Sequence, residues 1–198
     1  GNVNYSELSD FFYVWLKCIL NKKYVFFSPE QTPKAAEIIE NPTRGKTSED
    51  FEAGLTEVFT ECHRVLKNDG LLAFTFHHSV GETWQAVLES LCMAGFEIDS
   101  VYPIHGDEFK GGAMGAMEIS FDLIHVCRKR DAAHIEKRAW AGIRQEVRKK
   151  AREEIRLIES GRYGNEPLAP GDIQMILTGK CLELYSRHYG NIVDHEDR

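Results

Sequence analysis

The chain has 198 residues, which is enough for one domain or for one domain with an appendage. Its apolar fraction of 42% and charged fraction of 28% exclude global disorder, and its net charge of −7 does not suit a protein that binds nucleic acid over its whole surface. No apolar run approaches the roughly 20 residues that span a bilayer, and no signal peptide is recognisable, so we expect a cytoplasmic protein without a membrane partner.

The N-terminal part of the sequence predicts two helices with an irregular connection between them. Ser6 is a suitable N-cap, and apolar residues recur at helical spacing from Leu8 until about Asn21. Residues 22–47 contain three of the six prolines and should be irregular or partly helical. A capping box then opens an amphipathic helix that ends at the turn sequence NDG, residues 68–70; its two members are Thr47 and Asp50.

The middle of the chain alternates between strands and helices. The run LLAFTFHH, Leu71–His78, is so apolar that we expect a central strand of a sheet covered on both faces. A helix over residues 81–94 should end at Gly95, and residues 96–104 should form a second strand. The inward positions expected in that second strand are Phe96, Ile98 and either Val101 or Tyr102.

The last strand and two helices complete the predicted order. Residues 118–127 should form a strand with Ile119, Phe121, Leu123 and His125 on one side, after a glycine-rich loop at residues 109–117. Because that loop contains no helix, we expect the last two strands to form an antiparallel pair. A long helix from about 132 to 160 and a final helix over 172–187 follow. The sequence therefore predicts an α/β fold with a helical C-terminal extension.

The charge is concentrated in one segment. Residues 128–156 contain eleven Lys or Arg and five Asp or Glu. This basic segment could contact phosphates of a nucleic acid, with Arg148, Lys149, Lys150 and Arg152 as candidates. The alternative is a solvated helix whose charges form i,i+4 ion pairs with one another.

The cysteines are odd in number, widely separated and without a CxxC pair, which argues against a zinc site. We expect no metal, and free, mostly buried thiols in a reducing compartment. The five are Cys18, Cys62, Cys92, Cys127 and Cys181.

Several sequence blocks resemble one enzyme family. They are NYSELSDFFYVWL (4–16), ECHRVLKNDGLLAFTFHH (61–78), SFDLIHVCRKR (120–130) and GKCLELYSRHYG (179–190). Together they resemble the adenine-specific DNA methylases of the large type that carries a zinc ribbon. The resemblance implies a Rossmann-like sheet whose final strand enters antiparallel, S-adenosylmethionine as cofactor, and DNA as the partner from which an adenine is flipped.

The resemblance also defines what the 198 residues lack. The family's Asp-Pro-Pro-Tyr motif would lie just before residues 2–5, and neither it, a glycine-rich cofactor loop after a first strand, nor the cysteine ribbon occurs in the sequence. We therefore expect a fragment: residues 1–130 as the back half of the catalytic domain and 131–198 as a helical extension. The chain alone is expected to be inactive, to bind no S-adenosylmethionine, and to need the missing N-terminal half as its partner.

No catalytic residue is expected in the chain, but six residues could shape a substrate pocket at the carboxyl edge of the sheet. They are Asn4, Tyr5, Ser9, Asp10, His77 and His78. The alternative is structural: Ser9 and Asp10 satisfy amides at a helix start, Tyr5 packs locally, and a histidine is hydrogen-bonded in the fold.

Two other functions remain open at this point. One is a non-catalytic module that binds nucleic acid or a protein through the basic segment. The other is a methyltransferase that acts on RNA or a small molecule, since the RVLKNDG block is common to many methyltransferases. An open sheet edge would also favour a homodimer.

Overall fold

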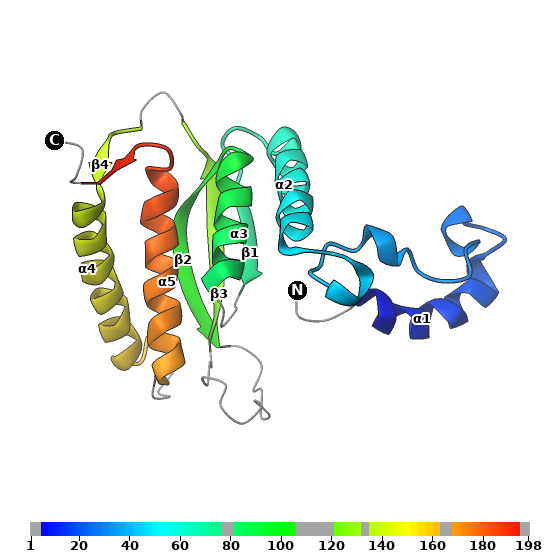
Figure 1. The fold of residues 1–198 in the computed structure, drawn as a ribbon. Helices are drawn as coiled ribbons and strands as arrows, with labels where there is room; N and C mark the ends of the chain where they lie inside the picture. Colours follow the sequence, from blue (N-terminus) through cyan, green and yellow to red (C-terminus); the bar gives the residue numbers. More distant parts are fainter. Residues whose placement is uncertain (1–4, 77–80, 106–120, 132–134, 163–167, 195–198) are drawn as a thin grey trace. The chain divides into compact units, whose positions relative to one another are not determined.

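The computed structural model describes residues 5–76, 81–105, 121–131, 135–162 and 168–194 (Figure 1). The fold is mixed α/β, as the sequence predicts. The chain divides into two compact units, residues 1–55 and 56–198. The boundary predicted near residue 130 is a functional one, between a catalytic portion and an extension. The division into compact units does not test it. Within the described ranges, no helix is both long enough and apolar enough to cross a membrane.

The first unit consists of one long helix and an irregular segment folded beside it. Helix α1, Tyr5–Leu20, forms where the apolar spacing predicts it, and three short 3₁₀ turns follow: η1 (Val25–Phe27), η2 (Lys34–Ala36) and η3 (Pro42–Arg44). Helix α2, Ser48–Val65, starts in this unit. The Thr47 N–H donates to Asp50 Oδ2 at 2.8 Å and the Asp50 N–H donates to Thr47 Oγ1 at 3.3 Å, so the predicted capping box is confirmed.

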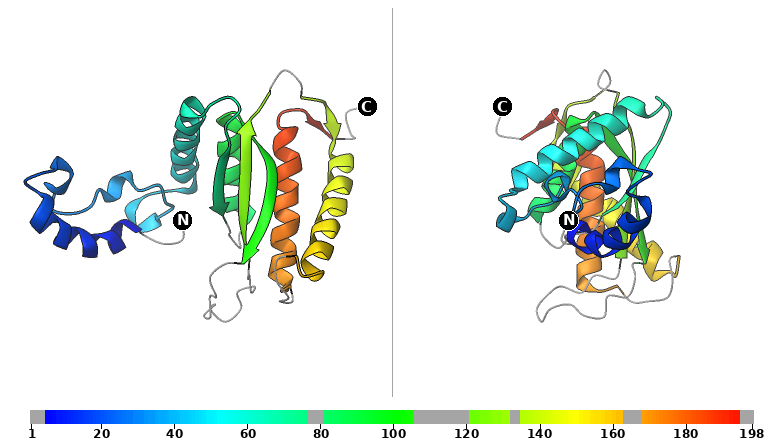
Figure 2. Two further views of the ribbon diagram at one scale, coloured as in Figure 1. Left: turned by 180° about the vertical axis from the view of Figure 1, so that it is seen from behind. Right: turned by 90° about the vertical axis from the view of Figure 1, so that its right-hand side faces the viewer.

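The second unit contains a three-stranded sheet and the helices that pack on it (Figures 1 and 2). Its elements after α2 are β1 (Leu72–Phe76), α3 (Gly81–Met93), β2 (Phe96–His105), β3 (Phe121–Lys129), β4 (Arg138–Ala139), α4 (Trp140–Glu159), α5 (Pro170–Arg187) and β5 (Ile192–Val193). Gly95, with a φ of 90°, ends α3 as predicted, because a residue with a side chain rarely adopts this left-handed backbone.

The strand order of the sheet is β1-β3-β2, and β3 is antiparallel to both neighbours. The predicted antiparallel pairing of the last two strands is therefore confirmed. Strands β1 and β2 run parallel to each other, are joined by α3, and are separated by β3. The chain thus makes a crossover from β1 to β2 and only later fills the space between them.

The prediction that Leu71–His78 is a central strand covered on both faces is wrong. Among the described strands, β1 pairs only with β3, and its side chains alternate between half-buried and exposed. Leu72, Phe74 and Phe76 face the helices, whereas Ala73 and Thr75 are exposed on the other side. Ala73 is apolar, but its side chain is small and its exposure costs little free energy. The sequence therefore reads as a continuous apolar run although the side chains of the strand alternate between the two faces.

One face of the sheet is covered by helices and holds the core. Phe74, His125 and Val101 lie opposite one another across the three strands. Trp84 of α3 contacts the His125 ring at 5.7 Å between centroids, and α5 packs close to Val101. The opposite face, which Figure 2 shows without a described helix over it, carries the exposed Tyr102 and Ile104.

Two further differences from the sequence prediction have local causes. A register shift between Ile98 and Ser100 in the β2–β3 pairing turns Val101 inward and leaves Tyr102 exposed, which decides between the two candidates. Helix α4 begins at Trp140, not near 132, because residues 138–139 are extended and pair with β5. The short β4–β5 sheet has no periodicity long enough to be recognised in the sequence.

Helix α5 is bonded to the sheet through buried polar side chains. Lys180 Nζ donates to the Val101 carbonyl at 3.0 Å, and Ser186 Oγ accepts the Ile98 N–H at 2.9 Å. The buried Glu183 carboxylate is surrounded by three cations, Lys150 at 2.9 Å, Arg187 at 3.1 Å and Lys180 at 3.4 Å. Together these groups join α4, α5 and β2.

Candidate nucleic-acid interface

Helix α4 has one apolar side that fixes its orientation on α5. Ile143, Val147, Ala151 and Ile158 are buried at spacings of four, four and seven residues. They pack with Leu184 and Ile176 of α5 in two small clusters. This packing leaves the opposite side of α4 exposed to solvent.

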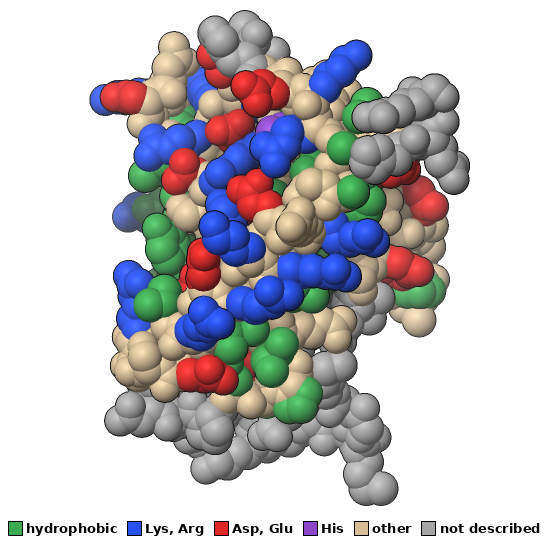
Figure 3. Space-filling view, turned by 90° about the vertical axis from the view of Figure 1, so that its left-hand side faces the viewer, with side chains coloured by type: hydrophobic (Ala, Val, Ile, Leu, Met, Phe, Trp, Pro, Cys, Tyr) green, Lys and Arg blue, Asp and Glu red, His purple; other side chains and the backbone are tan. Residues whose placement is uncertain are grey.

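The exposed side of α4 is basic. Arg144, Arg148, Arg152 and Arg156 repeat every four residues, and Lys149 lies beside them; we call these five residues the basic stripe. All five are exposed, and Figure 3 shows Lys and Arg side chains gathered on the face that carries α4. The stripe extends about 18 Å along the helix axis, which equals about five base-pair rises of duplex DNA.

Two acidic residues of α4 form ion pairs with cations outside the stripe. Glu146 pairs with Arg138 at 3.1 Å, and Glu154 pairs with Lys180 at 3.4 Å. In the part of the chain that the structure describes, no carboxylate lies within 4.0 Å of a basic group of the stripe. The five stripe residues thus form no close ion pair among the described residues, although Glu146 and Glu153 belong to the same helix.

The four candidate contacts from the sequence divide into two groups. Arg148, Lys149 and Arg152 lie together and line a hollow of about 530 Å³, to which Glu146 also contributes. Lys150 points to the other side of the helix and binds Glu183. A phosphate could thus approach the first three, while Lys150 is part of the contact between α4 and α5. Arg144 and Arg156, which complete the stripe, were missed as candidates although the four-residue spacing indicates them.

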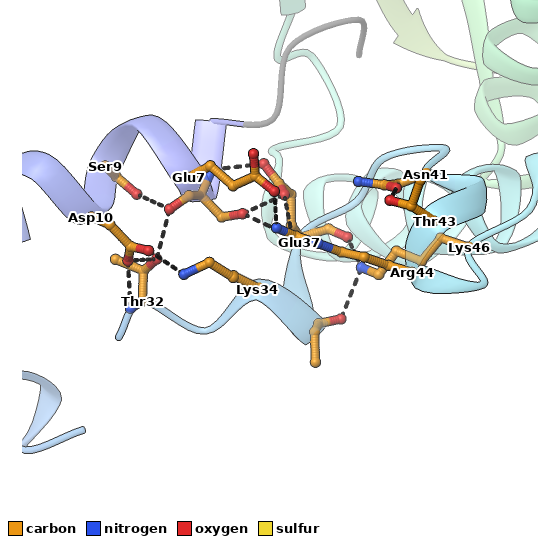
Figure 4. Close-up of polar contacts among 12 residues, drawn as sticks. Glu7, Ser9, Asp10, Thr32, Lys34, Glu37, Asn41, Thr43, Arg44 and Lys46 are labelled. Atoms are coloured by element: carbon orange, nitrogen blue, oxygen red, sulfur yellow. Dashed lines mark hydrogen bonds and ion pairs between the residues drawn. The ribbon is translucent and has the colours of Figure 1, made fainter. Parts of the chain in front are cut away.

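The pocket candidates Ser9 and Asp10 belong to a polar network within the first unit (Figure 4). Ser9 Oγ donates to the Ser6 carbonyl at 3.0 Å. Asp10 accepts hydrogen bonds from the Thr32 N–H at 3.0 Å, from Thr32 Oγ1 at 2.6 Å and from Lys34 Nζ. The Lys34 hydrogen bond, followed by those of Thr32, lowers the pKa of Asp10 to about 2. Both residues therefore have structural contacts, but the predicted ones are wrong: neither accepts an amide at the start of α1, and Asp10 instead binds Thr32 and Lys34.

Two residues of this network had no signal in the sequence. The Glu37 carboxylate accepts the Ser6 N–H at 2.8 Å and the Ser6 hydroxyl at 2.6 Å, so it caps α1 from 31 residues away. Hydrogen bonds from the Ser6 side chain and backbone hold the pKa of Glu37 below its ordinary value. Arg44 binds Glu7 and lies 3.7 Å from Glu37. Only the folded chain brings these groups together.

Of the remaining pocket candidates, the structure describes Tyr5 alone. Tyr5 is exposed at the start of α1. Asn4, His77, His78 and the glycine-rich loop at 109–117 lie outside the described residues. The strand that precedes the two histidines is the edge strand β1.

Comparisons with protein-family models, with curated proteins and with solved structures gave no match.

The cysteines are free thiols with different exposures. Cys92 and Cys127 are buried, and burial raises the pKa of each thiol to about 12. Cys18 is exposed, whereas Cys62 and Cys181 are half-buried, so the prediction of buried thiols holds for only some of them. Among the described residues, no three His, Cys, Asp or Glu side chains are arranged to hold a metal ion.

Proposed function

We propose that these residues supply the later strands and helices of an S-adenosylmethionine-dependent methyltransferase acting on the N6 amine of adenine in DNA. The observation that carries the proposal is the strand order β1-β3-β2 with β3 antiparallel to both neighbours. A final strand that enters antiparallel, after a helical crossover between parallel strands, is the ending that the family resemblance implies.

The sequence blocks behind the resemblance also meet in the sheet. The block at residues 61–78 includes β1, and the block at residues 120–130 includes β3. These two strands are paired, with Phe74 opposite His125 and Leu72 opposite Cys127. These two segments are about 50 residues apart in the sequence, and each resembles methyltransferases. In the structure they are neighbouring strands. Their pairing supports a Rossmann-like sheet as the origin of the resemblance.

The residues present do not by themselves fit S-adenosylmethionine. No glycine-rich loop follows a first parallel strand, and the hollow on α4 is lined by charged side chains. We therefore assign no residue to the cofactor and derive no reaction step through it. In the proposed enzyme, the acceptor groups that orient the adenine amine also come from outside these 198 residues.

The proposal is tested with the whole gene product that contains this chain. Incubation with duplex DNA and S-adenosylmethionine labelled in its methyl group should place the label in N6-methyladenine, as measured by nucleoside chromatography. Label in cytosine, in RNA alone or in no nucleic acid would contradict the proposal. The 198-residue chain alone should show no cofactor binding in calorimetry, and micromolar binding would contradict the statement that its residues do not fit S-adenosylmethionine.

A second function is favoured by the basic stripe, which could hold the phosphate backbone of DNA. Its five cations are exposed and are not paired with carboxylates among the described residues. Because the whole chain has a net charge of −7, binding should be weak, non-specific and strongly dependent on salt. This function is compatible with the methyltransferase, whose substrate would be the same polymer.

Neutralising four stripe residues is expected to weaken duplex DNA binding at low salt by at least roughly tenfold. The variant carries glutamine at Arg144, Arg148, Lys149 and Arg152. If each residue neutralises one phosphate, the slope of log K against log salt should become shallower by about 3 to 4. Fluorescence anisotropy of a labelled duplex over a salt series measures both quantities.

The matched control removes the same number of positive charges from exposed sites outside α4. It carries glutamine at Lys22, Lys23, Arg64 and Lys67. Both variants then have the same net charge, so the control should retain nearly all of the wild-type affinity. Equal losses in the two variants would mean that overall charge, and not the stripe, governs binding.

A further inference from the structure

Helix α1 carries its large apolar side chains on its outer side. Six of them are between 45% and 77% exposed and occupy one continuous side of the helix. We call them the α1 apolar face: Leu8, Phe11, Phe12, Trp15, Leu16 and Ile19. An exposed, contiguous apolar surface of this size usually marks an interaction site.

The opposite side of α1 binds the rest of the first unit through polar groups. Ser6, Asp10, Tyr13 and Lys17 follow one another at spacings of four, three and four residues and therefore lie in one row. Tyr13 Oη donates to the carbonyls of Pro29 at 2.8 Å and Phe26 at 3.2 Å. The helix cannot rotate to bury its apolar face inside the unit without breaking these hydrogen bonds.

We propose that the α1 apolar face is a self-association surface, on which α1 of a second copy packs antiparallel. The face contains no charged residue, so it can meet its own copy without burying an unpaired charge. A two-fold axis across the middle of the helix would place Leu8 of one copy near Ile19 of the other, and Phe12 near Trp15. This inference does not depend on the proposed enzymatic or nucleic-acid function.

The area of the face is adequate for such an interface. If a large side chain offers about 200 Å² and these six are exposed to the stated extents, each copy contributes roughly 700–800 Å². Specific protein interfaces bury about 800 Å² on each partner. Aromatic side chains, which form half of the face, are typical of the energetically important centre of an interface.

The charges at the helix ends favour the antiparallel arrangement. Lys22 and Lys23 follow the C-terminal end of α1, and Glu7 lies in its first turn. Parallel packing would bring the lysine pairs of two copies together. Antiparallel packing separates them by about the 24 Å length of the helix and also aligns the two helix dipoles favourably.

A lipid surface is a less suitable occupant than a second copy. Helices that lie on membranes carry Lys and Arg along their polar side. The polar side of α1 is already bonded within the unit, and residues 1–55 contain six Lys or Arg against eight Asp or Glu. Electrostatic attraction to anionic lipid is therefore not expected from this unit.

Analytical ultracentrifugation of the 198-residue chain tests the proposal. The wild type should show a reversible dimer of twice the 22.6 kDa chain mass, and the double variant Phe12→Glu, Trp15→Glu should remain a monomer. Val65→Glu, which changes a similarly exposed apolar residue on α2, is the control and should still form the dimer. Circular dichroism of each variant should retain the helical signal, because the altered side chains lie in solvent.

Cross-linking tests the orientation. In a Cys18→Ser background, the variants Leu8→Cys and Ile19→Cys should form a disulfide-linked dimer when mixed, and much less when each is alone. A monomer at all concentrations would overturn the proposal. So would dimerisation that survives the Phe12→Glu, Trp15→Glu change, or wild-type chain that binds vesicles of phosphatidylcholine and phosphatidylserine while remaining monomeric.

Discussion

Replacing Glu183 by alanine is expected to lower the free energy of unfolding by about 3–5 kcal/mol. The carboxylate is buried and lies between Lys150, Lys180 and Arg187. Among the described residues, its removal would leave the buried Lys180 with the Glu154 carboxylate and the Val101 carbonyl as partners. The expected effect is large because the buried Lys180 charge loses one of its two carboxylate partners, in addition to the attraction that Lys150 and Arg187 lose.

Urea denaturation measures this effect, and Glu61→Ala provides the control. Glu61 also binds an arginine, Arg64, at 2.6 Å, but both side chains are largely exposed. An exposed pair contributes at most about 1 kcal/mol, so this variant should be nearly as stable as the wild type. Similar losses in the two variants would show that burial of the Glu183 network is not what stabilises the contact between α5 and the sheet.

Replacing His125 by phenylalanine is expected to make the second unit more resistant to mild acid. His125 is buried and stacks on Phe74, with 5.0 Å between ring centroids and 12° between ring planes. Neither of its ring nitrogens makes a well-formed hydrogen bond among the described residues, and the backbone of Leu123 and Phe74 only partly offsets the effect of burial on its pKa. Burial, as the main cause, lowers the pKa of His125 from 6.5 to about 4.

The sign of the pH dependence follows from that shift. The unfolded chain takes up a proton on this residue below about pH 6.5, whereas the folded chain does so only near pH 4. The unfolded state binds more protons in this window, so stability is complete above it and falls as the pH decreases. Between pH 7 and pH 5 the protonation of this residue should lower the free energy of unfolding of the wild type by about 2 kcal/mol. The His125→Phe variant should not show this loss.

Urea unfolding at several pH values between 7 and 5 gives the slope of the free energy of unfolding against pH for the wild type and for His125→Phe. Phe74→Leu is the control, since it changes the ring stack without removing a titrating group. It should lower stability by a similar amount at each pH and keep the wild-type slope. A His125→Phe slope equal to that of the wild type would mean that other groups cause the acid sensitivity.

The sequence predicted those features of the fold that depend on local signals. The capping box at Thr47 and Asp50, the helix stop at Gly95 and the inward row of Phe121, Leu123 and His125 are all set by neighbouring residues. The position of β1 in the sheet was mispredicted, because an apolar run does not reveal how many neighbours a strand has. That number depends on segments far away in the sequence.

The candidate site shows the same division. The stripe on α4 could be found from its four-residue spacing, and Lys150 could have been separated from it because it lies about 200° around the helix from Arg148. Its actual partner, Glu183, is 33 residues away and could not be inferred. Likewise, Glu37 and Arg44 bind the start of α1 without any motif that connects the segments.

The place of β3 in the sheet has a consequence for how the protein is made. When residues 72–105 have left the ribosome, the segments of β1 and β2 are present, but the strand β3 that lies between them in the sheet has not yet been synthesised. Their hydrogen bonds cannot form until residues 121–129 emerge, and α5, which covers the sheet, is synthesised later still. During translation the nascent polypeptide therefore carries unpaired strand edges for many residues, a state in which chaperones would be most needed.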